Sequence, residues 1–250
     1  ASDVYKRQVM DILTVMYHRY LNIKKEDPKW EDRDRFILSK GHAGIAYAPV
    51  LCDFGYNDPE QLKTFNHTNS KMGIHLDSNK VVGVDASTGS LGHGLPVCVG
   101  MALAGKMDKK DYRVYTVMGD GELAEGSVWE GAMSAGNYKL DNLCAIVDRN
   151  RLQISGNTED VMKQDSQEER WAAFGWNVLS VPGNDMDALV HAFELAKHCK
   201  GKPTVIIANT TKGCGSSVME NKAEWHHKVP TPEEVEQIMK DLDERKEALS

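Results

Sequence analysis

Two apolar stretches of this chain end in short polar segments that could bind a metal ion. The run at 114–118 is followed by Gly-Asp-Gly at 119–121, and the run at 143–147 is followed by Asp-Arg-Asn at 148–150. Short apolar runs bounded by glycine and polar residues are typical of buried strands. We therefore expect a carboxylate at the end of one strand and a carboxamide at the end of the next strand along the chain.

The glycines favour a phosphate group near the first of these strand ends. Glycine lets the backbone approach a ligand closely, and the N-terminus of the helix expected after it attracts anions. A carboxylate repels a phosphate, so Asp120 indicates a bridging Mg²⁺, which prefers oxygen ligands in octahedral geometry. Asp120 would supply a carboxylate oxygen and Asn150 an amide oxygen, and the backbone carbonyl just beyond Asn150 is a candidate third ligand. The sequence thus predicts a diphosphate held through a metal ion.

Other interpretations of the glycines fit the pattern less well. A hairpin at Asp-Gly would need a strand after it, but the residues that follow have apolar side chains at helical spacing. Neither GDGELAEG nor TGSLGHG matches the dinucleotide pattern G-x-G-x-x-G, and the chain contains no G-x-x-x-x-G-K-[ST] motif. Nucleotide-binding classes are therefore disfavoured.

The elements that must position these residues alternate between strand and helix. We expect strands at 114–118, 143–148, 176–181 and 204–209, and helices at 9–20, about 122–137, 167–174, 186–199 and about 231–248. Apolar strands that alternate with helices form a mostly parallel sheet flanked by helices on both faces. The predicted fold class is α/β, with residues 1–250 as a single domain. Ligands of such sheets bind at the carboxyl ends of the strands.

The composition disfavours several classes of protein. The 250 residues carry a net charge of −7, whereas nucleic-acid-binding domains usually present a basic face. No apolar run approaches the roughly 20 residues of a membrane span, and no secretory signal pattern opens the chain. The 5 cysteines are widely spaced without a C-x-x-C pair, which argues against disulfides and zinc. We expect a cytoplasmic protein that binds neither nucleic acid nor membrane.

Several longer segments resemble transketolase. They are RFILSKGHAGIAYAPV, VDASTGSLGHGLPVCVGMALAGK, GDGELAEGSVWEGAMSAGNYKLDNLCAIVDRN, KPTVIIANTTKGCG and AEWHHKVP. The similarity is greatest to the separately encoded N-terminal half of split transketolases and extends from about residue 9 to the end. This resemblance implies a diphosphate-domain fold that binds thiamine diphosphate through Mg²⁺, or through Ca²⁺ or Mn²⁺ in its place.

The resemblance implies roles for individual residues. Asp120 and Asn150 match the metal ligands, and Leu152 matches the residue whose backbone carbonyl completes the set. The positions that match cofactor-binding residues are His42, Gly89, Leu91, Gly119, Gly121, Asn150, Ile154 and His226. The positions that match active-site groups are His42, His75 and His226, together with Glu125, which matches an acid of a carboxylate network that spans subunits.

The other histidines carry no such assignment. His18, His67, His191 and His198 are interpreted as surface or structural residues. The role of His93 stays open, because related transketolases often have Gln there, and the adjacent His227 makes the register of His226 ambiguous.

The resemblance implies reversible transfer of a two-carbon ketol unit between ketose and aldose phosphates, as in the pentose phosphate pathway. Thiamine diphosphate stabilises the carbanion of this reaction, and histidines can exchange protons with sugar hydroxyls near neutral pH. In this family, a second α/β domain supplies the glutamate on the aminopyrimidine and the basic groups that hold the sugar phosphate. The strand–helix alternation ends near residue 209. We therefore expect a C-terminal partner subunit, in an assembly of two plus two chains, and no activity without it.

The match is incomplete at the N-terminus. ASDVYKRQ, at 1–8, does not resemble the GHPGG-type segment of the family, which carries a further histidine, so we expect a truncation there. Ser90 stands where Pro is common, and Arg149 where many relatives have Asn or Asp. The alternatives are another thiamine enzyme, such as a deoxyxylulose-phosphate synthase or the α subunit of a 2-oxo acid dehydrogenase, or a non-catalytic paralogue. SKGHA, TGSLGHG and EWHH favour transketolase over the other enzymes.

Overall fold

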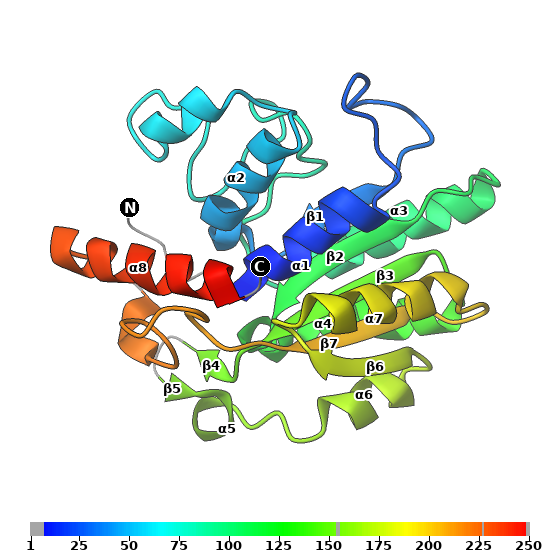
Figure 1. Cartoon of the computed structure of the whole chain (residues 1–250). Coiled ribbons are helices and arrows are strands. Elements are labelled where there is room, and N and C mark those ends of the chain that lie inside the picture. The colour runs from blue at the N-terminus through cyan, green and yellow to red at the C-terminus, as the bar shows by residue number, and fades with distance from the viewer. Residues whose placement is uncertain (1–7, 154–155, 227, 249–250) are drawn as a thin grey trace.

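A five-stranded sheet forms the centre of the structure (Figure 1). The computed structural model describes residues 8–153, 156–226 and 228–248. The strands, in their order across the sheet, are β1 (Arg35–Leu38), β2 (Val114–Gly119), β3 (Leu143–Arg149), β7 (Thr204–Asn209) and β6 (Asn177–Pro182). Every neighbouring pair is parallel. The predicted α/β fold class with a mostly parallel sheet is therefore confirmed.

The register of the central strands brings the two polar segments together. Gly119 of β2 lies opposite Asp148 of β3, and Arg149 lies opposite Asn209 of β7. Because the strands are parallel, their carboxyl ends meet at one edge of the sheet. The segments 119–121 and 148–150 thus lie side by side, as the sequence predicts.

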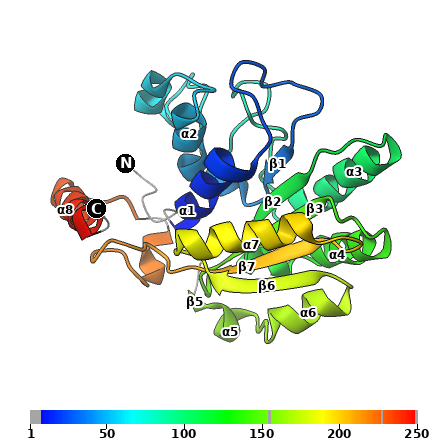
Figure 2. The ribbon, with the colours of Figure 1, turned by 45° about the vertical axis from the view of Figure 1, so that its right-hand side comes forward.

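Helices cover both faces of the sheet (Figure 2). The first face carries α1 (Gln8–Val15), α2 (Gly44–Asp53) and α7 (Met186–His198), and the second carries α3 (Gly94–Met107), α4 (Gly126–Asn137) and α6 (Gln167–Ala173). Side chains of β3 alternate between the two cores: Ile146 packs with the first set of helices, and Ala145 and Val147 pack with the second. Burial on both faces explains why the strands are apolar throughout.

Two predicted helices differ from the structure in their details. The first helix continues beyond α1 as a π-helical turn, Met16–Tyr20. The helix predicted at 122–137 begins instead as a 3-10 turn, Gly121–Ala124, and Glu125 is extended, with ψ 127°, before α4 starts at Gly126. The Glu122 carboxylate is turned back to accept the backbone N–H of Gly119, at 3.1 Å, and this contact fits a tight turn rather than a continuous helix.

The C-terminal part of the chain lies beyond the carboxyl edge of the sheet. β7 leads into a long loop and then α8 (Pro232–Ala248), whose N-terminus is capped by the Thr231 hydroxyl, as its sequence indicates. The short strands β4 (Leu152–Gln153) and β5 (Gly156–Asn157) and the single turn α5 (Thr158–Val161) also lie on this side (Figure 1). Among the residues that the structure describes, no helix is both long and apolar enough to span a bilayer.

Candidate functional site

Asp120 is the central acid at the carboxyl edge of the sheet. It follows β2 directly and is 2% exposed. One carboxylate oxygen accepts the backbone N–H of Gly121 at 2.8 Å, and the other accepts that of Arg151 at 2.6 Å. Burial raises the pKa of Asp120 to about 6, and the negative charge of Asp148 contributes to this rise, against the effect of these hydrogen bonds. Asp120 is thus a buried acid near a second acid, and the positive charge of Lys40 also acts to lower its pKa.

Asp148 is held by residues from the ends of two other strands. It is fully buried in β3, accepts a hydrogen bond from the Thr210 hydroxyl, and forms an ion pair with Lys40. Lys40 follows β1 and is itself 5% exposed. Removing either partner of such a buried pair is costly, because an uncompensated charge remains in a low-dielectric setting. The ion pair joins the ends of β1 and β3, and the Thr210 hydrogen bond joins the end of β7 to them.

The site also contains a second buried lysine, Lys212. Lys212 follows β7 and is 2% exposed, and its ammonium donates to the backbone carbonyl of Ala223 at 3.3 Å. Burial lowers the pKa of Lys212, whereas the negative charge of Asp120 acts to raise it. The sequence analysis assigned no role to Lys40, Asp148 and Lys212. Each of them stands at or just beyond the end of an apolar run, and this position could have indicated that they lie at the site.

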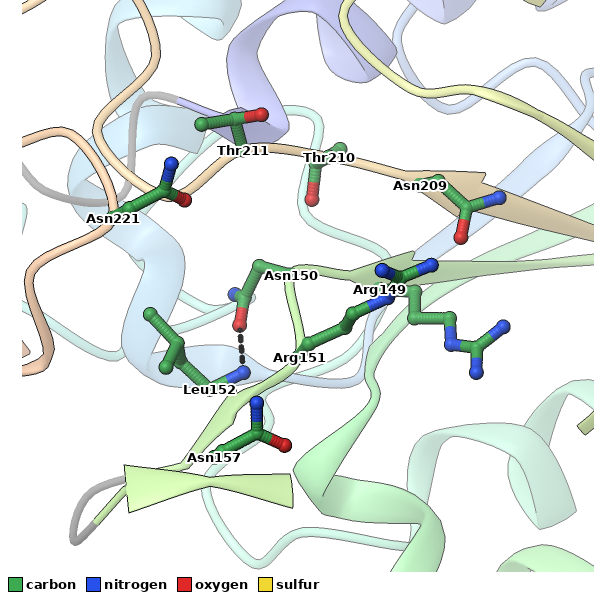
Figure 3. A pocket seen from close by; sticks show the side chains of 9 residues that line it. All are labelled: Arg149, Asn150, Arg151, Leu152, Asn157, Asn209, Thr210, Thr211 and Asn221. Atoms are coloured by element: carbon green, nitrogen blue, oxygen red, sulfur yellow. Dashed lines mark hydrogen bonds between the residues drawn. The ribbon is translucent and has the colours of Figure 1, made fainter. Parts of the chain in front are cut away.

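A cavity of about 450 Å³ opens where β3 and β7 end (Figure 3). Its lining is Arg149, Asn150, Arg151, Leu152, Asn157, Asn209, Thr210, Thr211 and Asn221. The Asn150 amide oxygen accepts the backbone N–H of Leu152 at 2.9 Å, which folds the chain tightly after β3. Arg151, with φ 61°, adopts the left-handed conformation within this turn. Two of the three predicted metal-ligand positions, Asn150 and Leu152, therefore line one polar cavity, and Arg151 links their turn to Asp120.

A side chain at position 121 would come close to Gln153. A Cβ atom at Gly121 would lie 3.0 Å from the Gln153 side chain. Gly119 is less restricted, since a Cβ there would lie 3.7 Å from Lys40. The backbone N–H of Gly121 donates to the Asp120 carboxylate at 2.8 Å, and the predicted role of Gly121 as a phosphate-binding amide stays a prediction.

A second group of predicted residues gathers around the loop at 85–94. A Cβ at Gly41 would lie 2.5 Å from the backbone oxygen of Thr88, so the turn that carries His42 touches this loop. The exposed His75 ring lies next to Gly89, with Cδ2 3.8 Å from the position of a Cβ there. His42 and Leu91 are half-buried. The structure thus brings His75 and Gly89 together and places the His42 turn against their loop.

The structure describes some of the remaining predicted residues and not others. Glu125 is exposed and immediately precedes α4. Ile154 and His227 lie outside the described residues. His226 ends a short 3-10 turn, Ala223–His226, but its side chain is not among those described. His93 is exposed, and its Nδ1 atom lies 3.1 Å from the backbone oxygen of Leu91.

The residues present fit a divalent cation that bridges to a diphosphate. The candidate donors are a carboxylate, an amide oxygen and a backbone carbonyl, all hard oxygen ligands of the kind that Mg²⁺ prefers. Each Asp120 oxygen receives one backbone N–H, and a carboxylate oxygen has about two acceptor positions, so capacity for a metal remains. A cation beside Asp120 would stabilise the ionised carboxylate against burial and the charge of Asp148, which both raise its pKa.

The fold is that of a thiamine diphosphate-binding α/β domain. Residues 6–247 match the family model described as "Transketolase, thiamine diphosphate binding domain", and the chain belongs to this family.

Three known proteins illustrate the relationship. The chain is 46% identical over 240 residues to one subunit of the apulose-4-phosphate transketolase of Phocaeicola vulgatus, covering 96% of this chain and 85% of that protein. It is 43% identical to a 6-deoxy-6-sulfo-D-fructose transketolase subunit of a Clostridium species, covering 90% of this chain and 82% of that protein. The solved transketolase of Campylobacter jejuni superposes with a TM-score of 0.83 at 28% identity. That match covers 95% of this chain but only 41% of the solved chain.

Proposed function

We propose that this chain is the N-terminal subunit of a transketolase-type enzyme. The observation that carries the proposal is the buried Asp120, which lies near a second acid and beside a polar cavity at the carboxyl edge of a sheet of this family. In the proposal Asp120, Asn150 and the backbone carbonyl of Leu152 hold Mg²⁺. Gly121, whose N–H donates to Asp120, and Lys212 would lie beside the diphosphate. Residues 1–250 would form a single cofactor-binding domain, and the free cysteines suit a cytoplasmic setting.

The histidines would serve the substrate side of the reaction. Bound thiamine diphosphate supplies an electron sink for breaking and forming a carbon–carbon bond next to a carbonyl. We assign His75, which is exposed beside Gly89, to exchange protons with substrate hydroxyls. His42, and His226 by its position in the sequence, would face the diphosphate and the reacting centre. Gly89, Leu91 and Ile154 would contact the rings of the cofactor.

The enzyme would be complete only with a partner chain. Relatives that this chain covers over most of their length are named as subunits of a transketolase, and single-chain transketolases extend far beyond the matched region. We therefore propose a C-terminal partner subunit in an assembly of two plus two chains. Glu125 is exposed at the start of α4, and this exposure supports its place in a carboxylate network between subunits.

Two classes of ketose phosphate are candidate donors. Transfer of a ketol unit between ketose and aldose phosphates, as in the pentose phosphate pathway, is our first candidate. A second candidate is favoured by the relatives: transfer from a less common ketose, because the most similar proteins described above are named for apulose 4-phosphate and for a sulfo-sugar.

The test measures ketol transfer by this chain together with a C-terminal partner chain. Xylulose 5-phosphate and apulose 4-phosphate would be compared as donors, with ribose 5-phosphate and glyceraldehyde 3-phosphate as acceptors, in the presence of thiamine diphosphate and Mg²⁺. We expect activity with the two chains mixed and none with either chain alone. Full activity of this chain alone would contradict the proposed division of the site. Cofactor binding by the mixture without transfer from either donor would exclude both substrate candidates.

A further inference from the structure

Glu122 is a buried acid that the proposed chemistry does not use. It follows Asp120 and Gly121 in the 3-10 turn after β2 and is 2% exposed. Acids are rarely buried to this extent unless their charge is matched by hydrogen-bond donors or cations. Its partners therefore indicate why the position holds a carboxylate.

Three donors converge on the Glu122 carboxylate. The Ser39 hydroxyl and the backbone N–H of Gly92, the latter at 2.9 Å, both donate to Oε1. The backbone N–H of Gly119 donates to Oε2 at 3.1 Å. Hydrogen bonds to an ionised acceptor are stronger than those between neutral groups. One side chain thus satisfies donors from three separate stretches of the chain.

Each of these stretches carries residues of the proposed cofactor site. Ser39 precedes the turn with His42, Gly92 closely follows Gly89 and Leu91, and Gly119 precedes Asp120. Two further contacts tie the loop at 89–94 in place: the backbone N–H of Gly94 donates to the Ser39 hydroxyl at 3.1 Å, and the Ser127 hydroxyl donates to the Gly92 carbonyl at 3.0 Å. Gly92 itself has φ 83°, so the loop adopts a conformation that other residues rarely reach.

Neither a shorter nor a neutral side chain reproduces this arrangement. Glutamine would place an NH₂ group against one of the backbone N–H groups, because it has only one acceptor oxygen. Alanine would leave the backbone N–H groups of Gly92 and Gly119 without this acceptor in a buried setting. The position thus requires an acid with two acceptor oxygens and the length of glutamate.

We propose that Glu122 is a positioning residue: its carboxylate sets the relative placement of the three segments at 39–42, 89–94 and 119–121, so that the cofactor meets a preformed site. This inference rests on the proposed function only for the identity of the ligand. A ligand that meets a preformed site does not have to order three loops when it binds, and it binds more tightly for that reason.

Hydrogen exchange of the full chain tests the placement directly, without any cofactor. Glu122→Ala is expected to raise amide exchange at least about tenfold in all three segments, while β7 (Thr204–Asn209) stays as protected as in the wild type. Ser39→Ala removes one donor to Glu122 and the acceptor of the Gly94 N–H, and we expect faster exchange at 39–42 and 89–94 with unchanged protection at Gly119. Glu130→Gln, an exposed acid on α4, is the matched control and should change none of them.

The glutamine variant at the same position, in the assembled two-chain enzyme, gives the second readout. For Glu122→Gln we expect the apparent KM for thiamine diphosphate to rise about tenfold, with kcat at saturating cofactor within about threefold of the wild type. Unchanged exchange, or a rise spread equally over β7, would show that Glu122 merely stabilises the fold and would overturn the proposal. If the wild-type assembly needs no thiamine diphosphate, the proposed function fails, while the exchange data still decide the role of Glu122.

Discussion

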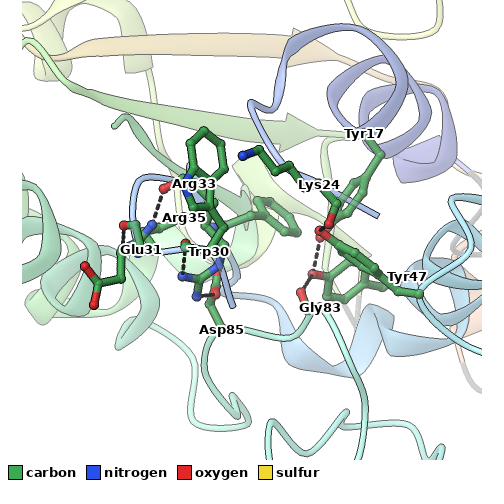
Figure 4. A network of polar contacts seen from close by, with 11 residues as sticks. Tyr17, Lys24, Trp30, Glu31, Arg33, Arg35, Tyr47, Gly83 and Asp85 are labelled. Atoms are coloured by element: carbon green, nitrogen blue, oxygen red, sulfur yellow. Dashed lines mark hydrogen bonds and ion pairs between the residues drawn. The ribbon is translucent and has the colours of Figure 1, made fainter. Parts of the chain in front are cut away.

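The two edges of the central sheet both carry buried or half-buried acids, but these acids have different surroundings: Asp120 at the carboxyl edge lies near a second acid, whereas Asp34 and Asp85 at the amino edge lie near arginines. At the amino edge, Asp34 precedes β1 and accepts the backbone N–H groups of Asn22, at 2.9 Å, and Arg113, at 2.7 Å. Asp85 accepts the N–H of Phe36 at 2.7 Å and forms an ion pair with Arg33 (Figure 4). Each of these acids has its partners within the chain.

The carboxyl edge differs in what surrounds its acids. Burial raises the pKa of both Asp34 and Asp120, and in Asp34 the neighbouring hydrogen bonds and arginines act to lower it. In Asp120 the second cause is another acid, Asp148, which also raises the pKa. A cavity adjoins the carboxyl edge, where Asn150 and Arg151 line it. The comparison teaches that burial alone does not mark a ligand site. The features that distinguish Asp120, the proposed metal ligand, are the like charge of Asp148 and the adjacent polar cavity.

The largest effect is expected from a substitution at the carboxyl edge. Asp120→Asn should weaken Mg²⁺-dependent binding of thiamine diphosphate by at least about 100-fold, or roughly 2.7 kcal/mol, because one charged metal ligand is lost. The measurement is calorimetric titration of the two-chain assembly with cofactor at fixed Mg²⁺. Asp160→Asn, an exposed acid of α5, serves as the control. Equal affinity of wild type and Asp120→Asn would refute the metal assignment.

At the amino edge the same type of change should affect stability and leave cofactor affinity unchanged. Asp34→Ala removes the acceptor of two backbone N–H groups from a residue that is 5% exposed. We expect the free energy of unfolding to fall by about 2 kcal/mol, the cost of leaving buried donors unpaired. Urea denaturation measures it. Asp32→Ala is the control, because Asp32 and Lys110 form an exposed ion pair that contributes little. A large loss of cofactor affinity in Asp34→Ala would remove the distinction between the edges.

The convergence of the two strand ends could be predicted from the sequence. The apolar runs define the strands, and two successive parallel strands with a helix between them bring Asp120 and the segment at 148–150 to the same edge. The residue types at the strand ends were sufficient for this inference, because parallel strands have their carboxyl ends at the same edge of the sheet.

The contacts that hold the site together could not be predicted in the same way. Glu122 meets Ser39 across 83 positions of sequence, and Lys40 meets Asp148 across 108. Helical periodicity assigned Glu122 to the start of a helix, but its carboxylate turns back to the Gly119 amide. The short pair of strands β4 and β5 was also missed, since two residues per strand leave no periodicity to read.

A smaller effect is expected from the tyrosine pair of the amino edge. Tyr17 and Tyr47 share a hydrogen bond between their hydroxyls, and the Tyr47 hydroxyl also lies 3.0 Å from the Gly83 carbonyl (Figure 4). Burial raises the pKa of both hydroxyls, so both remain protonated. Tyr47→Phe deprives the buried Tyr17 hydroxyl of this partner and should cost about 1–1.5 kcal/mol.

Tyr17→Phe should cost about half as much, because Tyr47 can still donate to Gly83. Thermal unfolding of the two single variants and the double variant gives the coupling between the hydroxyls. Strict additivity of the two losses would show that the hydrogen bond between them contributes nothing to stability.

The smallest effect is expected at Asp141, just before β3, and it depends on pH. Burial acts to raise the pKa of Asp141, but the Gly201 amide at 2.8 Å and Lys106 at 2.7 Å outweigh this and hold the pKa below its ordinary value of 3.8. A lowered folded-state pKa gives stability that is fully present above pH 3.8 and is lost as the pH falls through the folded-state value.

Asp141→Asn should therefore lower the free energy of unfolding at pH 7 by about 0.5 kcal/mol, a modest figure because the pair is partly exposed. The difference should shrink as the pH falls below 3.8 in urea denaturation series, with the exposed Asp111→Asn as control. A loss of equal size at pH 3 and pH 7 would mean that the geometry of the side chain, and not its charge, stabilises this end of the sheet.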